Sequence, residues 1–208
     1  MNVEFKNINK HFGPVHANVD INLCINSGSI YGILGENGAG KSTLMKVLSG
    51  FMQPDSGEIL LDGKVVTIDS PADAINYGIG MLHQDPLDFP PMRLIENFIV
   101  GQKGGLVPSY KNTIKQFQEL QKKFGFSLDP DAYVDTLTVG ERQQLEILRL
   151  LWMGANALIL DEPTTGISSL QKEKLFAALR ILANQGKTII FVSHKLEDVE
   201  ALDRKSVV

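Results

Sequence analysis

The amino-acid sequence predicts an α/β protein with a mostly parallel sheet core, an N-terminal antiparallel β subdomain and a helical subdomain insertion. Short continuous apolar runs at residues 30–34, 157–160 and 188–192 are typical of strands buried in a parallel sheet. Amphipathic helical stretches separate these runs, so strand, helix and strand alternate. That order implies right-handed crossovers between parallel strands.

Composition limits the classes of protein that the chain can belong to. The 208 residues suggest one large domain or a domain with an inserted subdomain. A formal net charge of −4 does not favour a nucleic-acid binder, which is usually basic. The single cysteine, Cys24, excludes an intrachain disulfide and a multi-cysteine zinc site, and we expect it to pack in the core. No apolar run reaches the length of a spanning helix, and the first residues lack the apolar run of a signal peptide.

The N-terminal region should form antiparallel strands. Apolar residues alternate with polar ones over residues 3–8 and 19–25, the pattern of half-buried strands. A second pair of strands, at residues 57–61 and 64–68, flanks Asp62 and Gly63, a dipeptide typical of a tight hairpin turn.

The parallel core begins with the strand at residues 30–34. It leads into a glycine-rich segment at residues 35–42 and then a helix at residues 43–48, which Gly50 should end. A strand-like run follows at residues 79–82.

The helical insertion should occupy about residues 85–150, so that residues 1–84 and 151–208 form the core. Three prolines predict a loop at residues 85–91, and a mainly helical pattern follows over residues 94–124. The helical pattern is interrupted at Gly101, Gly104, Gly105 and Pro108. After the insertion, residues 170–184 predict an amphipathic helix between the last two core strands.

The glycine-rich segment at residues 35–42 matches the P-loop pattern GxxxxGKS between a strand and a helix. Its glycines let backbone N–H groups turn inward toward phosphate oxygens, and the next helix presents its positive dipole end to the same anion. Lys41 would reach the β- and γ-phosphates, and Ser42 would offer a hydroxyl to Mg²⁺. The phosphate-binding candidates are Gly35, Glu36, Asn37, Gly38, Ala39, Gly40, Lys41, Ser42 and Thr43.

Three further segments carry polar residues at the ends of predicted strands. Asp161 and Glu162 follow the apolar run 157–160, which predicts that Asp161 holds Mg²⁺ and Glu162 polarises the attacking water. His194 follows the last strand and would hold that water against the γ-phosphate. Gln84 follows residues 79–82 and would join the Mg²⁺ shell. Taken singly, Asp161 and Glu162 could be a solvated strand-end pair. In the same way, His194 could be a structural histidine and Gln84 an ordinary loop residue.

A second helix N-terminus is predicted at Thr138. The spacing of Thr138 and Glu141 is that of a capping box, so a well-capped helix running to about Trp152 explains the motif in isolation. The functional alternative is that Thr138, Gly140 and Glu141 bind the γ-phosphate. Because this helix lies in the insertion, it would read the nucleotide of a facing copy.

Together these motifs resemble the nucleotide-binding domain of ABC transporters over essentially the whole chain. The resemblance implies a P-loop NTPase of the ABC-cassette fold that hydrolyses ATP with Mg²⁺. The matching positions are Phe12 as the adenine-stacking aromatic, residues 35–42 as Walker A, Gln84 as the Q-loop, residues 137–141 as the signature motif, Asp161 and Glu162 in Walker B, and His194 as the switch histidine.

The sequence departs from the family pattern at three places. Its signature reads Leu-Thr-Val-Gly-Glu over residues 137–141 instead of Leu-Ser-Gly-Gly-Gln, which is similar to importers of simple sugars and nucleosides. Ser168 stands where the family's D-loop has aspartate, which weakens the case for coupling across the dimer at this point. The chain also stops at Val208, where the family continues, so we expect the last part of the usual domain to be missing.

The resemblance also implies partners. These are transmembrane permease subunits, a second nucleotide-binding domain in a homodimer or tandem cassette, and a solute-binding protein, with no nucleic acid. The chain would then sit peripherally on the cytoplasmic face of the cell membrane. Residues 85–101, including the apolar Phe98, Ile99 and Val100, would contact the permease.

The alternatives are a chromosome- or repair-type ABC ATPase and a ribosome-associated one. The first usually carries coiled coils or zinc modules between the phosphate motifs, and the second two cassettes with basic linkers. The sequence has no heptads or cysteines in its insertion and no basic run.

Overall fold

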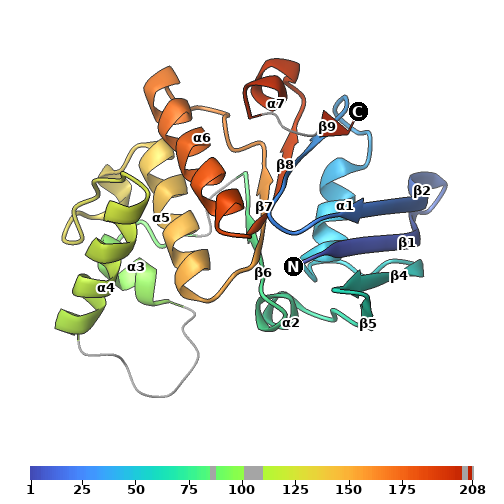
Figure 1. The fold of residues 1–208 in the computed structure, drawn as a ribbon, viewed down its shortest axis with the longest axis horizontal. Helices are drawn as coiled ribbons and strands as arrows, with labels where there is room; N and C mark the ends of the chain where they lie inside the picture. Colours follow the sequence, from blue (N-terminus) through green and yellow to red (C-terminus); the bar gives the residue numbers. More distant parts are fainter. Residues whose placement is uncertain (85–87, 101–109, 203–205, 208) are drawn as a thin grey trace.

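The computed structural model describes residues 1–84, 88–100, 110–202 and 206–207. The interrupting residues predicted at Gly101, Gly104, Gly105 and Pro108 lie outside these ranges, as do residues 85–87. In the described ranges no helix has both the length and the apolar character needed to cross a bilayer. Figure 1 shows the antiparallel strands beside α1, a central sheet, and α3, α4 and α5 on the opposite side of the molecule.

A four-stranded antiparallel sheet forms from the N-terminal region, as predicted. Its strand order is β2 (Val15–Ile25), β1 (Val3–Phe12), β4 (Ser56–Leu61) and β5 (Lys64–Val66). Asp62 and Gly63 connect β4 to β5 with φ angles of 49° and 78°. Two positive φ angles at the centre of a two-residue turn match the twist of the flanking strands, so the dipeptide signal was correct.

The second sheet is parallel, and it positions the candidate site. Its order is β6 (Ile79–Leu82), β7 (Ala157–Asp161), β8 (Thr188–Ser193), β3 (Ile30–Leu34) and β9 (Ser206–Val207). The register pairs Leu82 with Leu160, Asp161 with Val192, and Leu34 with Ser193. The carboxyl ends of four strands therefore lie level along one edge of the sheet.

The described residues also form helices and a 3₁₀ turn. These elements are α1 (Lys41–Leu48), α2 (Pro71–Asn76), α3 (Leu94–Ile99), α4 (Tyr110–Lys123), η1 (Val134–Thr136), α5 (Val139–Trp152), α6 (Ser169–Asn184) and α7 (Leu196–Leu202). The sequence predicted α1, α5 and α6 and a helical stretch where α3 and α4 occur. It missed α2, although Ser70 and Pro71 form an ordinary helix start, and it missed α7.

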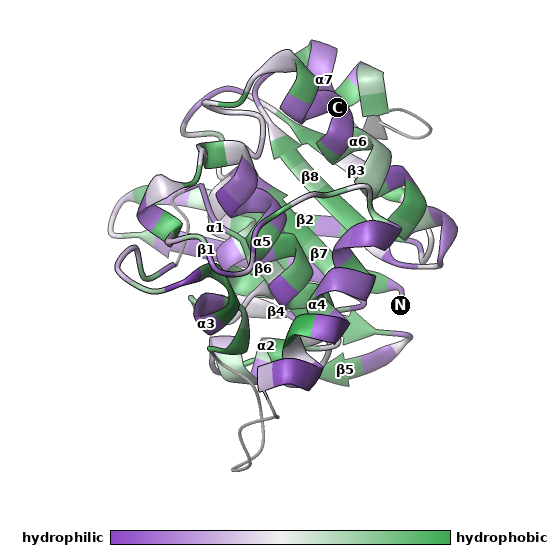
Figure 2. Ribbon diagram, turned by 90° about the vertical axis from the view of Figure 1, so that its left-hand side faces the viewer, coloured by the Kyte–Doolittle hydropathy of each residue, from purple (hydrophilic) through white to green (hydrophobic). Residues whose placement is uncertain are grey.

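The parallel sheet separates two hydrophobic cores, and β8 contributes to both. Ile189 and Phe191 face the core shared with α5 and α6, whereas Ile190 and Val192 face the core shared with α1 and the antiparallel sheet. Because both faces of β8 are covered, its sequence is a continuous apolar run rather than an alternating one. Figure 2 shows β7 and β8 in the hydrophobic colour at the centre of the molecule.

Cys24 corrects one expectation. It is exposed, not part of the core. In the β1–β2 register Cys24 lies opposite Glu4, while the buried Val3 and Phe5 lie on the other face of β1. Side chains alternate between faces along a strand, so Cys24 shares the outward face with Glu4. The single-residue argument from cysteine's apolarity could not assign that face.

Candidate functional site

The segments that follow four parallel strands converge on one edge of the second sheet (Figure 1). The P-loop segment follows β3, Gln84 follows β6, Glu162 follows β7, and His194 follows β8. Ligands of open α/β sheets bind beyond the carboxyl ends of the strands. The fold thus brings together residues that are more than 150 positions apart in the sequence.

The P-loop segment curls tightly at its glycines. Gly38 and Gly40 have φ angles of 87° and 86°, and Gly40 is the N-cap of α1. The ammonium of Lys41 folds back over the segment and donates to the carbonyl oxygens of Gly35, at 2.6 Å, and Glu36, at 2.9 Å. This places a positive charge beside the free N–H groups of the first turn of α1, which is the arrangement that holds phosphate.

The antiparallel sheet supports this segment from behind. Asn18 of β2 donates from Nδ2 to the carbonyl oxygen of Gly40 at 3.2 Å. A Cβ atom at Gly40 would lie only 2.1 Å from the carbonyl oxygen of Ala17, so no side chain fits there. Sequence reasoning missed Asn18, because its place in an alternating strand gave no signal of a contact with a loop 22 residues later.

Asp161 lies buried at the end of β7, with Oδ1 free of any hydrogen bond from the described residues. Burial raises the pKa of Asp161, a hydrogen bond with Ser42 opposes that rise, and the neighbouring Glu162 adds to it. A buried carboxylate oxygen without a partner, beside a serine hydroxyl, offers the hard oxygen ligands that Mg²⁺ prefers. The donor set therefore fits the predicted metal.

Glu162 and His194 lie against each other. Nδ1 of His194 is 2.8 Å from Oε2 of Glu162, an ion-pair distance without the alignment of a hydrogen bond. Glu162 has a φ of 51°, and its backbone N–H donates to Val192 of β8 at 3.0 Å. A left-handed backbone at a glutamate is strained, and such strain is concentrated at functional positions.

Gln84 is exposed at the end of β6. Its neighbour His83 packs edge-on against Phe51 with ring centroids 4.6 Å apart. Burial lowers the pKa of His83, and the charge of Asp161 opposes that shift. His83 therefore brings a second imidazole within electrostatic range of Asp161, which sequence reasoning did not identify.

Thr138 is the N-cap of α5 and forms the predicted capping box with Glu141. Oε2 of Glu141 accepts from the backbone N–H of Thr138 at 2.8 Å and from its hydroxyl at 2.7 Å. The same hydroxyl accepts from Nε2 of Gln171 at 2.9 Å. Within the described part of the chain, no hydrogen bond joins Thr138 or Gly140 to the P-loop segment.

A buried carboxylate connects the segments that carry Glu162 and His194. Asp198 of α7, only 1% exposed, accepts a hydrogen bond from the hydroxyl of Thr164 and lies 2.5 Å from Nζ of Lys172 in α6. Thr164 follows Glu162 by two residues, and Asp198 follows His194 by four. Sequence reasoning did not identify Asp198, which reads as an ordinary polar position of a short helix.

Two further predictions concern aromatic residues, and the adenine-stacking role of Phe12 stays a prediction. Phe12 lies at the end of β1 with 46% of its surface exposed, so its ring is accessible, as adenine stacking would need. Phe98 is fully buried against Phe117 and Trp152, so it does not provide the apolar contact surface predicted for residues 85–101.

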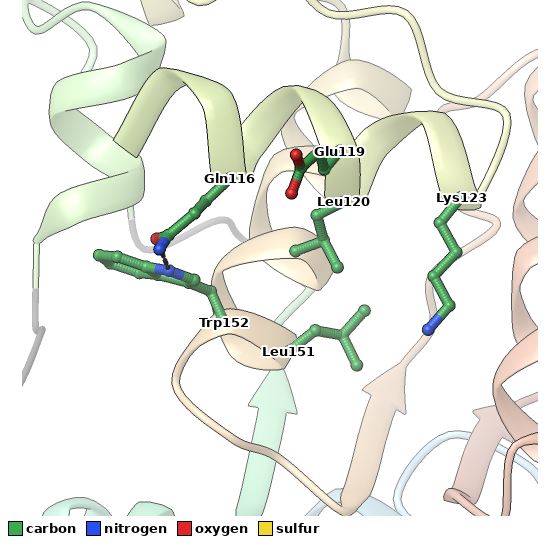
Figure 3. Close-up of a pocket in the computed structure, with 6 residues that line it drawn as sticks. All are labelled: Gln116, Glu119, Leu120, Lys123, Leu151 and Trp152. Atoms are coloured by element: carbon green, nitrogen blue, oxygen red, sulfur yellow. Dashed lines mark hydrogen bonds between the residues drawn. The ribbon is translucent and has the colours of Figure 1, made fainter. Parts of the chain in front are cut away.

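An open pocket of about 420 Å³ between α4 and α5 lies apart from these residues. Figure 3 shows Gln116, Leu120 and Trp152 on its walls, with the indole Nε1 donating to Oε1 of Gln116 at 3.1 Å. No predicted site residue lines it.

Comparisons with known proteins agree with the family that the sequence resembles. Residues 19–165 match the family described as ABC transporter. The nucleoside import ATP-binding protein NupA of Lactococcus lactis is 40% identical over 99% of this chain and 41% of its own length. The glucose import ATP-binding protein TsgD13 of Haloferax volcanii is 40% identical over 99% of this chain and 43% of its own length. The chain thus spans about two fifths of the relatives that it matches.

Solved structures share the fold. A nucleotide-free ATP-binding cassette from an ABC transporter superposes with a TM-score of 0.86 at 26% identity, covering 97% of this chain and 85% of that one. A dimeric post-hydrolysis ATP-binding cassette bound to ADP and Pi superposes with a TM-score of 0.79 at 25% identity, covering 94% of this chain and 89% of that one.

Proposed function

We propose that this chain, which belongs to the ABC transporter family, is an ATP-binding and ATP-hydrolysing subunit that powers an importer. One observation carries the proposal. The P-loop, Asp161, Glu162 and His194 meet at one edge of a parallel sheet although they come from distant parts of the chain. A phosphate cradle, a metal ligand and a candidate base are the parts that phosphoryl transfer to water requires.

Residues 35–43 would hold the triphosphate. The N–H groups at the start of α1 would donate to phosphate oxygens. Lys41 would leave the carbonyl oxygens of Gly35 and Glu36 for the β- and γ-phosphates. Phe12 would stack on the adenine. Mg²⁺ would be held by Ser42, Asp161 and Gln84 and would neutralise charge between the β- and γ-phosphates.

Glu162 would act on the attacking water. As the water oxygen attacks the γ-phosphorus, Glu162 would accept a proton from it. The bond between that phosphorus and the β–γ bridging oxygen breaks, which leaves ADP and inorganic phosphate. His194, 2.8 Å from Glu162, would keep the carboxylate and the γ-phosphate in fixed positions relative to each other.

A second copy would complete the site. Thr138, Gly140 and Glu141 have no described contact with the P-loop of their own chain, while the N-terminus of α5 is a helix start suited to an anion. The dimeric cassette with ADP and Pi supports a dimer of this fold. Two chains facing head to tail would enclose each ATP between one P-loop and the other chain's Thr138.

The cargo would be a simple sugar or a nucleoside, because the named relatives import such molecules. The chain would then bind permease subunits at the cytoplasmic face of the membrane, in a system that includes a solute-binding protein. The same relatives do not favour the chromosome-, repair- or ribosome-associated alternatives.

Calorimetry with Mg²⁺ and ATP tests the binding half of this proposal, and phosphate release tests the chemistry. We expect heat of binding that disappears in Lys41→Ala, with Lys122→Ala, at an exposed position of α4, as the control. Equal binding in the wild type and Lys41→Ala would contradict the assignment. Co-purification with a permease tests the transport role.

A further inference from the structure

The side-chain amide of Gln171 joins the starts of two helices. Its Oε1 accepts from the backbone N–H of Ser168, the N-cap of α6, at 3.0 Å. Its Nε2 donates to the hydroxyl of Thr138, the N-cap of α5, at 2.9 Å. One neutral side chain therefore closes the capping box of its own helix and at the same time binds the cap of another helix 33 residues earlier.

Gly140 makes room for this amide. A Cβ atom at Gly140 would lie 2.7 Å from Cδ of Gln171 and 2.8 Å from its Nε2. Any larger residue at position 140 would push the amide off the first turn of α5. Packing within a single chain therefore accounts for a glycine at position 140, in addition to the close approach of a nucleotide.

The polarity of these contacts requires a glutamine. The hydroxyl of Thr138 has one proton, which it donates to Oε2 of Glu141 at 2.7 Å, so its lone pairs are free to accept from Gln171 and from the N–H of Glu141 at 3.3 Å. A group that accepts from Ser168 and donates to Thr138 must carry both functions, as a carboxamide does. A glutamate could do only the first.

We propose that Gln171 is a positioning residue that fixes the hydroxyl of Thr138 relative to the segment following Glu162, so that the signature helix meets the nucleotide of a facing copy in a defined orientation. This rests on the proposed function. Ser168 ends the segment that starts at Glu162, so Gln171 connects the hydrolytic edge of one chain to the surface that it offers its partner. Ser168 and Gln171 thereby provide a link where the family's D-loop aspartate is absent.

The matched pair Gln171→Glu and Gln171→Ala separates positioning from stability. Gln171→Glu keeps an acceptor for Ser168, removes the donor to Thr138 and adds a negative charge beside Glu141. Gln171→Ala removes both contacts and adds no charge. The melting temperature of Gln171→Glu should therefore be higher than that of Gln171→Ala, because only the alanine variant loses the α6 capping box.

The steady-state parameters for Mg-ATP should rank in the opposite order. We expect the KM of Gln171→Glu to rise about tenfold, the effect of one lost hydrogen bond plus like-charge repulsion, with a smaller rise in Gln171→Ala and a smaller change in kcat. Gln118→Glu is the control, since it makes the same charge change at an exposed position of α4. Its KM should equal that of the wild type.

Three outcomes overturn the inference. A wild-type KM in Gln171→Glu would show that the donor to Thr138 is dispensable. Losses of thermal stability and activity that run in parallel through both variants would show that Gln171 only caps α6. Absence of phosphate release from the unsubstituted chain would remove the proposed function as well, which separates that failure from the other two.

Discussion

Nδ1 of His194 lies 2.8 Å from Oε2 of Glu162, across the ends of the neighbouring strands β7 and β8. The backbone N–H of Glu162 donates to Val192 at 3.0 Å, so the sheet itself sets the spacing of these two side chains. The pairing also keeps a base candidate next to a group that can donate to phosphate.

Replacing Glu162 by glutamine should separate binding from hydrolysis. The amide keeps the shape of the side chain but cannot accept the proton of the water, so phosphate release should fall by about 10²–10⁴-fold. Calorimetry should still detect binding of Mg-ATP. Turnover of Glu162→Gln at the wild-type rate would contradict its role as the base.

The two left-handed glycines of the P-loop should respond differently to alanine. At Gly38 an added Cβ meets no atom within 4 Å, so Gly38→Ala should cost about 1–2 kcal/mol of unfolding free energy from its φ alone. At Gly40 the same atom would lie 2.1 Å from the backbone oxygen of Ala17, so Gly40→Ala should cost clearly more. Urea unfolding measures both. Equal losses would mean that the loop separates freely from β2.

Replacing one or the other partner of the ion pair between Lys172 and Asp198 should lower the free energy of unfolding by different amounts. The carboxylate is 1% exposed and the side chain of Lys172 is 34% exposed. Lys172→Met strands a buried charge and should lower the free energy of unfolding by about 3 kcal/mol. Asp198→Asn leaves an ammonium that can reach water and should cost about 1 kcal/mol.

Chemical denaturation of these two variants and of the double variant provides the check. Lys115→Met is the control, because Lys115 and Glu119 form an exposed pair with atoms 3.9 Å apart, and its loss should be close to zero. If Asp198→Asn destabilised the chain more than Lys172→Met, the hydrogen bond with Thr164 would be the dominant contact instead.

Glu146 should give the stability a pH dependence of unusual sign. Burial raises the pKa of Glu146 above its ordinary 4.5, Arg149 opposes this shift, and Asp88 adds to it. Between the ordinary pKa and the raised one, the folded chain binds more protons than the unfolded chain, so this contribution to stability falls as pH rises.

Glu146→Gln removes that contribution. We therefore compare the free energy of unfolding of Glu146→Gln with that of the wild type. The difference, variant minus wild type, should increase as pH rises through this window. Leaving Arg149 without its partner at 2.8 Å adds a constant cost that does not change this trend. Urea unfolding across a pH series measures the difference. A difference that decreases with pH would show that Arg149 keeps the pKa of the glutamate low.

The sequence predicted those parts of the fold and site that depend on local patterns. Residues 35–42, the turn at Asp62 and Gly63, and the capping box at Thr138 each require particular residue types at fixed spacing, so they could be recognised without a structure. The buried strands were recognisable because both of their faces are covered.

Contacts between distant positions could not be predicted in this way. Gln171 looks like a simple capping residue until α6 is packed against α5, and Asp198 looks like a surface residue until α7 folds over Thr164. Cys24 and Phe98 were assigned to the wrong environment for the same reason. Residue type alone does not fix which face of a strand or helix is covered.

The position of β3 in its sheet has a consequence for the growing polypeptide. Its neighbours are β8 and β9, which a ribosome makes more than 150 residues later. The loop around Lys41 is made early and can contact Asn18 of β2 at once, but its own strand gains its sheet partner only when Thr188–Ser193 has been added. Throughout that interval the apolar β3 has no neighbouring strand of its own sheet, so transient collapse or a chaperone has to cover it.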